Sequence, residues 1–331
     1  MNDISPWVLP AGVDLLADYA TEIGSNLRLV QGAGGNVSVK EGAVVWIKAS
    51  GTRLADARVA PIFVAVDVAA ARPAVLETEA LEPFVLAEIS PPGLRPSIET
   101  ALHVLLPHRF VVHVHAVGSI AAGLDDLVLE RLASFPDWFR TLVVPYAKPG
   151  IMLARAVNSV LDGPIDDSAP LALVLRNHGL VVGAGDLVAI NRIITSIESI
   201  FVTGVPPVLI PIESSVSVDG FVPLAPAGTL TMKQAGLLMH GPLTPDSAVY
   251  LGATPFGFED QVTETCSCIV HFDGSVSLRA HFGADERESA ASLIDVARLA
   301  SPGARISAIP GSDVDELLDW DAEKWRTALK R

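Results

Sequence analysis

The sequence predicts an α/β fold in which apolar strands alternate with amphipathic helices. Two short apolar runs, 110–117 and 171–175, have the length and composition of buried strands. Segments 13–29 and 186–202 carry apolar residues at helical spacing. A chain of 331 residues also corresponds to two units at roughly 150 residues per domain. We therefore expect a larger α/β domain followed by a smaller one.

Local signals define the other elements of the first domain. Pro96 cannot extend a helix backwards and Ser97 is a good N-cap, so a helix is expected from Ile98 onward. Lys40-Glu41-Gly42 separates two strand-like runs and predicts a hairpin turn. The remaining elements expected before residue 205 are a hairpin over 36–47, helices over 81–88, 98–105 and 151–161, a loop-and-helix region over 124–140, and a short strand over 143–146.

A proline-dense segment, 205–211, marks the expected boundary between the two units. We expect a catalytic domain over 1–208 and a small α+β domain over 209–331. Within the second unit, Asp273-Gly274 is a strong turn dipeptide and predicts a hairpin. Helices are expected there over 284–299 and 313–329.

Composition excludes several classes of protein. The net charge of −15 argues against nucleic acid, whose affinity depends on Lys and Arg neutralising phosphates. Mean hydropathy is +0.43, yet no uninterrupted apolar stretch reaches the ~18 residues of a membrane span. The first residues lack the basic and apolar regions of a signal peptide, and Cys266 and Cys268 imply no disulfide framework. A cytoplasmic protein is expected.

His113 and His115 stand in the apolar run 110–117, where Val or Ile would otherwise be expected. Side chains alternate along a strand, so both imidazoles point to one face, about 7 Å apart along the backbone. Both rings can then bind one cation at a Zn–N distance of roughly 2.0–2.1 Å. A pair of core histidines with local hydrogen bonds is the alternative.

Two further residues strengthen the metal-site interpretation. His178 follows a buried strand and precedes Gly179, where backbone can approach closely. Glu99 stands in the first turn of a predicted helix, although a carboxylate there also suits the helix dipole. Three histidines and one carboxylate are typical of a catalytic metal site with an open position. His103, on the same helix face as Glu99, either orients that carboxylate or packs in the core.

The glycine-rich segment 32–36 does not form a dinucleotide-binding fingerprint. The third glycine of that motif would fall at Val37, and the segment precedes a hairpin rather than a helix. Together with Ser50-Gly51 on a second loop, it can instead offer N–H and hydroxyl donors to an anion. Two ordinary tight turns are the alternative.

These segments together resemble the class II aldolase/adducin family. The resemblance covers about 15–204, and five motifs occur in the family's order: Gly34-Gly35-Asn36-Val37-Ser38-Val39, Ile47-Lys48-Ala49-Ser50-Gly51-Thr52, Pro96-Ser97-Ile98-Glu99-Thr100-Ala101-Leu102-His103, Val112-His113-Val114-His115 and Asn177-His178-Gly179-Leu180-Val181-Val182-Gly183. Within the family the chain is most similar to long aldolase modules of the rhamnulose-1-phosphate aldolase type. Ser50-Gly51-Thr52, Ser97-Ile98-Glu99-Thr100 and the tail 319–326 carry that closer resemblance.

The resemblance implies a three-layer α/β/α domain with a central, mainly antiparallel sheet. It implies a metal-dependent aldolase that cleaves a ketose, with a ketose 1-phosphate favoured, through a metal-stabilised enediolate. His113, His115 and His178 would bind a divalent metal, with Zn²⁺ the expected ion. Glu99 would act as acid/base, with its pKa raised by partial burial or held in check by the metal. Glu at this position favours an aldolase over the family's epimerases.

The resemblance also implies a phosphate site, a proton-donating tyrosine and a homo-oligomer, with a tetramer expected. The implied substrate-binding residues are Gly35, Asn36, Ser50, Gly51 and Ser97. Ile98 departs from the second Ser of better-known members, so a non-phosphorylated substrate stays open. Tyr146 is the expected proton donor, and Tyr250 is the alternative. Two other functions also stay open: an epimerase or decarboxylase using the same metal, and a non-catalytic adducin-like scaffold.

Overall fold

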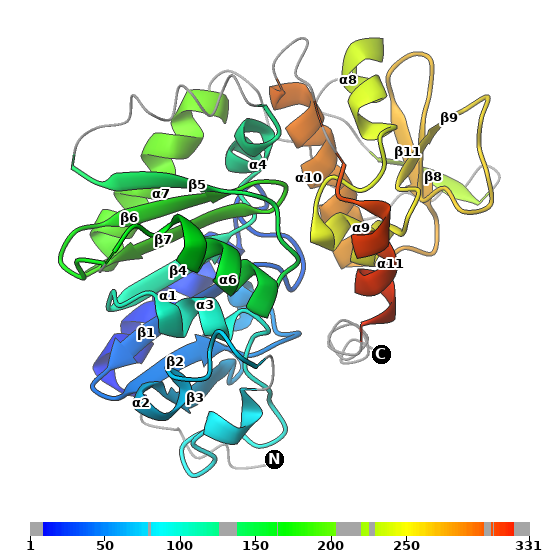
Figure 1. The fold of residues 1–331 in the computed structure, drawn as a ribbon. Helices are drawn as coiled ribbons and strands as arrows, with labels where there is room; N and C mark the ends of the chain where they lie inside the picture. The colour runs from blue at the N-terminus through cyan, green and yellow to red at the C-terminus, as the bar shows by residue number, and fades with distance from the viewer. Residues whose placement is uncertain are drawn as a thin grey trace.

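The computed structural model describes residues 9–78, 81–125, 138–163, 165–202, 220–224, 229–300, 306 and 308–320. Within these ranges a larger sheet has the strand order β3-β2-β1-β4-β7-β6-β5, and a smaller sheet has the order β8-β11-β10-β9. Figure 1 shows the larger sheet in blue to green, beside the yellow-to-red C-terminal elements. The strands of the larger sheet are β1 (Asn36–Glu41), β2 (Val44–Lys48), β3 (Phe63–Asp67), β4 (Phe110–Val114), β5 (Arg140–Val144), β6 (Leu171–Leu175) and β7 (Gly179–Ala184).

Neighbouring strands of the larger sheet run antiparallel except for the β5–β6 pair. This confirms the mainly antiparallel sheet. The register sets Asn36 of β1 opposite His113 of β4, and His113 opposite Val181 of β7. Directly opposed residues point to the same face of a sheet, so Asn36 and His113 project together.

Helices cover both faces of this sheet, which confirms the three-layer α/β/α prediction (Figure 1). Alternate strand residues supply the two cores. Val112 and Val182 pack with Ile190 of α7 on one face, and Val111 and Leu173 pack with α3 and α6 on the other. The covering helices are α1 (Ala11–Gly24) and α7 (Leu187–Val202) on the first face, and α3 (Thr100–Leu105) and α6 (Ile151–Val160) on the second.

The C-terminal elements form a small α+β unit, as expected. Its core joins the α10 residues Leu293 and Ile294 to Val117 and Ile120 of α4 (Val117–Gly123), so this unit packs directly on the larger domain. The predicted hairpin forms between β10 and β11, with Cys268 opposite Leu278. The elements are β8 (Phe221–Leu224), α8 (Met232–Leu238), α9 (Pro245–Leu251), β9 (Phe256–Phe258), β10 (Cys268–Val270), β11 (Val276–Arg279), α10 (Ala284–Leu299) and α11 (Gly311–Asp319).

The helix expected over 81–88 is wrong. Only a short 3₁₀ turn, η2 (Glu82–Phe84), forms there. Pro83 lacks an N–H group, and the chain then turns toward β3, where Val85 bridges Val66 and the Leu86 N–H bonds the Ala65 carbonyl. Pairing with the sheet edge therefore overrides the local helical pattern.

Two predicted helix boundaries are also wrong. α1 ends at Gly24, five residues before the expected end at 29. The N-cap of α3 is Glu99 rather than Ser97. The Ser97 hydroxyl instead accepts a hydrogen bond from the Glu99 N–H at 3.2 Å, and this tightens the turn that precedes the helix.

Two predictions fall wholly or mostly outside the described residues: the loop-and-helix region over 124–140 and the boundary at 208. The last helix, predicted over 313–329, starts near the expected residue, but its predicted end is wrong: α11 ends at Asp319, and Trp320 is extended. Two short helical segments also lie in the larger domain: the 3₁₀ helix η1 (Leu54–Asp56) and the α-helix α2 (Val68–Ala71).

No helix of the described chain has both the length and the apolar character required to cross a bilayer.

Candidate metal centre

Three histidines meet where β4 ends and its neighbour β7 begins. His113 lies in β4, His115 follows this strand directly, and His178 lies in the turn between β6 and β7. The Nε2 atom of His113 lies 3.1 Å from Nε2 of His115 and 3.3 Å from Nε2 of His178. Because β4 and β7 are paired antiparallel, the end of one strand adjoins the start of the other.

This geometry fits a bound metal ion. Tetrahedral ligands at Zn–N distances of about 2.0–2.1 Å are separated from one another by about 3.3–3.4 Å. One ring nitrogen from each of the three buried histidines lies within 4.8 Å of the others, and the two separations given above are close to the tetrahedral value. The donor set is therefore that of a transition-metal site such as zinc.

Glu99 completes the cluster at the start of α3. Its Oε2 atom lies 3.5 Å from Nε2 of His113, and its Oε1 atom lies 3.5 Å from Nε2 of His178. Asn36 donates a hydrogen bond from Nδ2 to Oε2 at 2.6 Å. Oε1 is buried without a hydrogen-bond partner in the described chain. A buried carboxylate oxygen in this position is satisfied by a cation or by substrate.

The electrostatics of the cluster favour a cation. Burial lowers the pKa of His113 and lowers that of His178 to about 3, so both rings are neutral at pH 7. Burial raises the pKa of Glu99, but the attraction of His113 and His178 in their protonated forms and the Asn36 hydrogen bond outweigh it and lower the pKa to about 2. The prediction that partial burial raises the pKa of Glu99 is therefore wrong. An ionised carboxylate beside neutral imidazoles attracts a positive ion.

Further contacts hold the cluster in place. The Nδ1 atom of His113 donates to the Leu180 carbonyl at 3.2 Å. His103 bonds the Oδ1 atom of Asn36 through Nε2, and its Nδ1 atom lies 2.7 Å from Ser38 Oγ. His103 therefore packs in the core, and its hydrogen bond to Asn36 links it to Glu99. Burial lowers the pKa of His103 to about 3, which keeps this ring neutral.

A cavity opens beside Glu99, His115 and His178. The residues predicted to bind substrate all line it: Gly35, Asn36, Ser50, Gly51 and Ser97. Gly35 has φ +60° and Gly51 has φ +79°, a left-handed backbone conformation that favours glycine over other residues. Ile98 also lines this cavity. The two glycine-containing loops and the metal-binding residues therefore surround one space.

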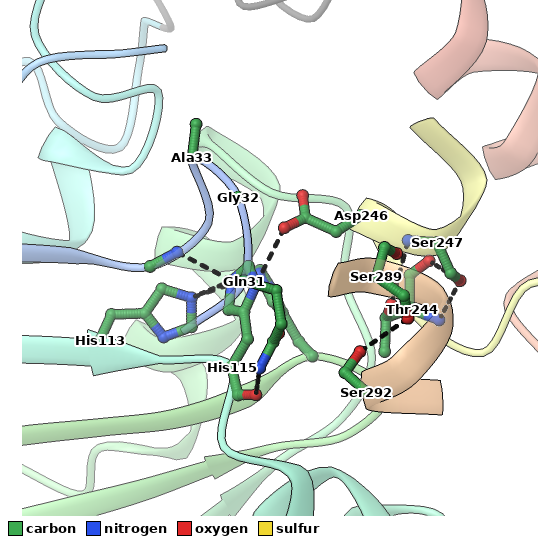
Figure 2. A network of polar contacts seen from close by, with 12 residues as sticks. Gln31, Gly32, Ala33, His113, His115, Thr244, Asp246, Ser247, Ser289 and Ser292 are labelled. Atoms are coloured by element: carbon green, nitrogen blue, oxygen red, sulfur yellow. Dashed lines mark hydrogen bonds and ion pairs between the residues drawn. The ribbon is translucent and has the colours of Figure 1, made fainter. Parts of the chain in front are cut away.

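Sequence reasoning missed two residues that line the same cavity, Lys48 and Asp246. The Lys48 Nζ atom is buried and donates to the carbonyls of Ala33 at 2.8 Å and Gly35 at 3.0 Å. A lysine that ends an otherwise apolar strand was the signal available for it. Asp246 belongs to the C-terminal unit, and its Oδ2 atom lies 3.0 Å from Nδ1 of His115 (Figure 2). A first-turn aspartate in a helix gave no signal of that contact.

The two candidate tyrosines lie away from this cavity. Tyr146 packs beside Val314 and Leu317 of α11. Burial, together with Asp313 and Glu316, raises the pKa of its hydroxyl. Tyr250 lines a second cavity of about 610 Å³, which shares Gly51 with the first. The proton-donating role of Tyr146, with Tyr250 as the alternative, therefore stays a prediction.

Comparison with known proteins gives a family match over most of the larger domain. The model of the "Class II Aldolase and Adducin N-terminal domain" matches residues 14–202. The "Uncharacterized oxidoreductase YuxG" of Bacillus subtilis is 29% identical over 187 residues, which are 52% of this chain and 26% of that protein. The chain thus matches about a quarter of that relative's length.

Solved structures give weaker matches. The N-terminal class II aldolase domain of a conserved protein from Thermoplasma acidophilum is 28% identical, with a TM-score of 0.48, and covers 61% of this chain and 99% of that one. The L-fuculose-1-phosphate aldolase of Thermus thermophilus is 20% identical, with a TM-score of 0.35, and covers 56% of this chain and 90% of that one.

The family match spans more than half of the chain, and the matched segment contains every residue of the metal centre except Asp246. The chain therefore belongs to the class II aldolase and adducin family.

Proposed function

We propose that the protein is a metal-dependent aldolase, a carbon–carbon lyase that cleaves a ketose, with a ketose 1-phosphate as the favoured substrate. One observation carries the proposal. The Glu99 carboxylate lies 3.5 Å from both His113 and His178, beside a cavity lined by glycine and serine loops. A scaffold protein has no need for a buried carboxylate among three ligand-type histidines.

His113, His115 and His178 would hold the divalent ion, with Zn²⁺ expected from the all-nitrogen donor set. When bound, such an ion supplies Lewis-acid stabilisation of negative charge that develops on the ketose oxygens during cleavage. His113 and His178, whose pKa values burial lowers, would bind as neutral ligands and leave the charge of the ion undiminished.

Glu99 would transfer the proton at the nucleophilic carbon. Carbon–carbon cleavage next to a carbonyl leaves a carbanion that must take up a proton before the product leaves. The lowered pKa of Glu99 keeps its carboxylate ionised, which suits proton removal from that carbon in the condensation direction. In the cleavage direction Glu99 must first take up a proton, equivalent to the one that the substrate hydroxyl releases as the carbon–carbon bond breaks, before it can deliver a proton to the carbanion. Asn36 orients the carboxylate through its 2.6 Å hydrogen bond to Oε2.

The anionic end of the substrate would bind the loops that contain Gly35, Ser50, Gly51 and Ser97. Lys48 adds a positive charge at this wall and supplements the hydroxyl that Ile98 lacks. Lys48→Met should therefore raise KM for a phosphorylated ketose more than for its unphosphorylated analogue. An equal rise in KM for both substrates would show that Lys48 does not bind the phosphate.

Tyr146 would protonate the aldehyde oxygen, with Tyr250 as the alternative. Family resemblance suggests that such a tyrosine acts across a subunit interface, so we also propose a homo-oligomer, with a tetramer expected. Tyr146→Phe and Tyr250→Phe separate the candidates, since only the true donor should lower kcat with little change in KM. Size measurement in solution tests the oligomer independently.

Product analysis tests the proposed function. Purified protein reconstituted with Zn²⁺ is incubated with a panel of ketose 1-phosphates and, separately, with a panel of keto acids, and the products are identified by mass and NMR. Release of dihydroxyacetone phosphate and an aldehyde supports the aldolase. An isomer of unchanged mass would indicate an epimerase, and carbon dioxide from a keto acid would indicate a decarboxylase. If metal is bound but a broad panel of such substrates gives no turnover, the scaffold alternative gains support.

A further inference from the structure

Asp246 brings a carboxylate from the C-terminal unit to a histidine of the metal centre. It lies in the first turn of α9, and its Oδ2 atom lies 3.0 Å from Nδ1 of His115. Both side chains are largely shielded, with 13% of Asp246 and 8% of His115 exposed. Figure 2 shows Asp246 reaching from the C-terminal segment toward the His115 ring.

The hydrogen bonds of His115 fix its tautomer. The backbone N–H of Gly35 donates to Nε2 at 3.4 Å, and an N–H group cannot accept. Nε2 therefore carries a lone pair, and Nδ1 is the ring nitrogen that holds a proton. Nδ1 lies 3.0 Å from Oδ2 of the Asp246 carboxylate, within ion-pair distance, while Nε2 points toward His113 at 3.1 Å. Nε2 is thus the ring nitrogen that faces the metal position, and a bound ion would take the lone pair that the Gly35 N–H contacts in this structure.

Neighbouring residues make the contact possible. A Cβ at Gly34 would lie 2.7 Å from both Asp246 Oδ2 and His115 Nδ1, so a larger residue there would separate the pair. The N-terminus of α9 is fixed by a capping box between Thr244 and Ser247. Asp246 therefore projects from a rigid turn into a gap that glycine leaves open.

We propose that Asp246 is a positioning residue for the metal ligand His115, and that the C-terminal unit thereby completes the metal centre. A carboxylate hydrogen-bonded to the far nitrogen of a ligand histidine fixes its orientation and increases its basicity toward the metal. The Leu180 carbonyl serves His113 in the same way but carries no charge. This inference rests on the metal dependence stated under the proposed function.

Metal affinity of the full chain tests the inference without relying on turnover. We expect Asp246→Ala to weaken Zn²⁺ binding about 10–100-fold, measured by competition with a chromogenic chelator. Asp246→Asn, which can still accept the hydrogen bond but lacks the charge, should fall between that variant and wild type. The visible spectrum of Co²⁺-loaded protein should change in Asp246→Ala, because His115 is no longer held in one orientation.

Glu288→Gln is the matched control. Glu288 also joins the C-terminal unit to the larger domain, through the Gly32 N–H at 2.6 Å and an ion pair with Arg53, but it touches no histidine. This control should change Zn²⁺ affinity by less than about 3-fold, since it leaves the contact between His115 and Asp246 intact. Circular dichroism checks that each variant is folded.

Four results would overturn the inference. Equal Zn²⁺ affinity in Asp246→Ala and wild type would remove the positioning role and leave the proposed function intact. An equal loss of Zn²⁺ affinity in Asp246→Ala and Glu288→Gln would show that the contact between Asp246 and His115 only holds the C-terminal unit on the larger domain. Unchanged Zn²⁺ affinity with a raised KM in Asp246→Ala would show that Asp246 binds substrate rather than positioning His115. Wild-type protein that binds no divalent metal would overturn both the inference and the proposed function.

Discussion

Asn36 donates a hydrogen bond from Nδ2 to Oε2 of Glu99 at 2.6 Å, and this contact joins the first strand of the sheet to the candidate acid/base. The Asn36 Oδ1 atom is in turn bonded by His103, so the amide cannot rotate without losing both partners. Asn36 was expected to bind substrate. The structure adds that it orients and stabilises the ionised carboxylate.

Asn36→Ala should lower kcat/KM about 10–100-fold, because a hydrogen bond to a charged group is worth about 1.5–3 kcal/mol. The bond favours the ionised form of Glu99, so its loss raises the Glu99 pKa. The acidic limb of the pH–rate profile should therefore move to higher pH. An unchanged acidic limb in the variant would show that Asn36 does not act on Glu99.

Glu99→Gln should lower kcat about 10²–10⁴-fold, the usual contribution of a positioned general acid or base. The amide keeps the size of the carboxylate but cannot exchange a proton. His113, His115 and His178 remain, so the variant should still bind metal. Turnover and metal content are measured on the same preparation. A variant that retains metal and more than about a tenth of the wild-type kcat would contradict the role of Glu99.

Gly179→Ala should damage both the fold and the metal centre. Gly179 has φ +154°, and a Cβ there would lie 2.3 Å from the Val114 carbonyl oxygen. β4 and β7 would have to separate between His115 and His178. We expect a loss of about 1–3 kcal/mol in the free energy of unfolding, together with weaker Zn²⁺ binding.

Gly185→Ala is the control for this variant. Gly185 follows the other end of β7, and a Cβ there meets no atom within 4 Å. This variant should keep both stability and Zn²⁺ affinity. If Gly179→Ala behaved like the control in urea unfolding and metal titration, the close approach of the two strands would not matter to the site.

Lys40 should make stability depend on pH. Burial, with a smaller contribution from Arg72, lowers its pKa from 10.5 to about 7 in the folded chain. Between pH 7 and 10.5 the unfolded chain therefore binds more protons, and folding stability rises with pH. Relative to Lys40→Met, the wild type should gain up to about 1.4 kcal/mol per pH unit across that window.

Urea unfolding at several pH values measures this slope, and Lys233→Met at an exposed position controls for the loss of a charge. Parallel stability curves for Lys40→Met and wild type would show that Lys40 is not desolvated in the fold.

Much of the centre could be predicted because short-range rules determine it. Alternation along a strand brings His113 and His115 together, and Gly179 permits the close approach next to His178. The Pro96-Ser97 start signal placed Glu99 at the beginning of a helix, and the structure differs from this only in making Glu99 the N-cap of α3. In each case the spacing within one segment was sufficient to set the direction of the side chain.

Other features depended on contacts between distant segments. The helix expected over 81–88 was lost because Val85 pairs with Val66 across the sheet edge. Asp246 reaches His115 only because α10 packs on α4 and brings the C-terminal unit to the strand ends. No periodicity in the sequence encodes that packing. The lowered pKa of Glu99 likewise depends on Asn36 and the surrounding histidines, which a burial argument alone does not include.

Elemental analysis of the purified protein, before and after chelation, tests the central claim most directly. Three buried histidines with converging nitrogens should retain about one divalent ion per chain, and His178→Ala should lose it. Reloading the chelated wild type with Zn²⁺ should restore that content and raise the thermal midpoint, because the ion binds only the folded chain. A wild-type protein that stays free of divalent metal after reconstitution would contradict the account.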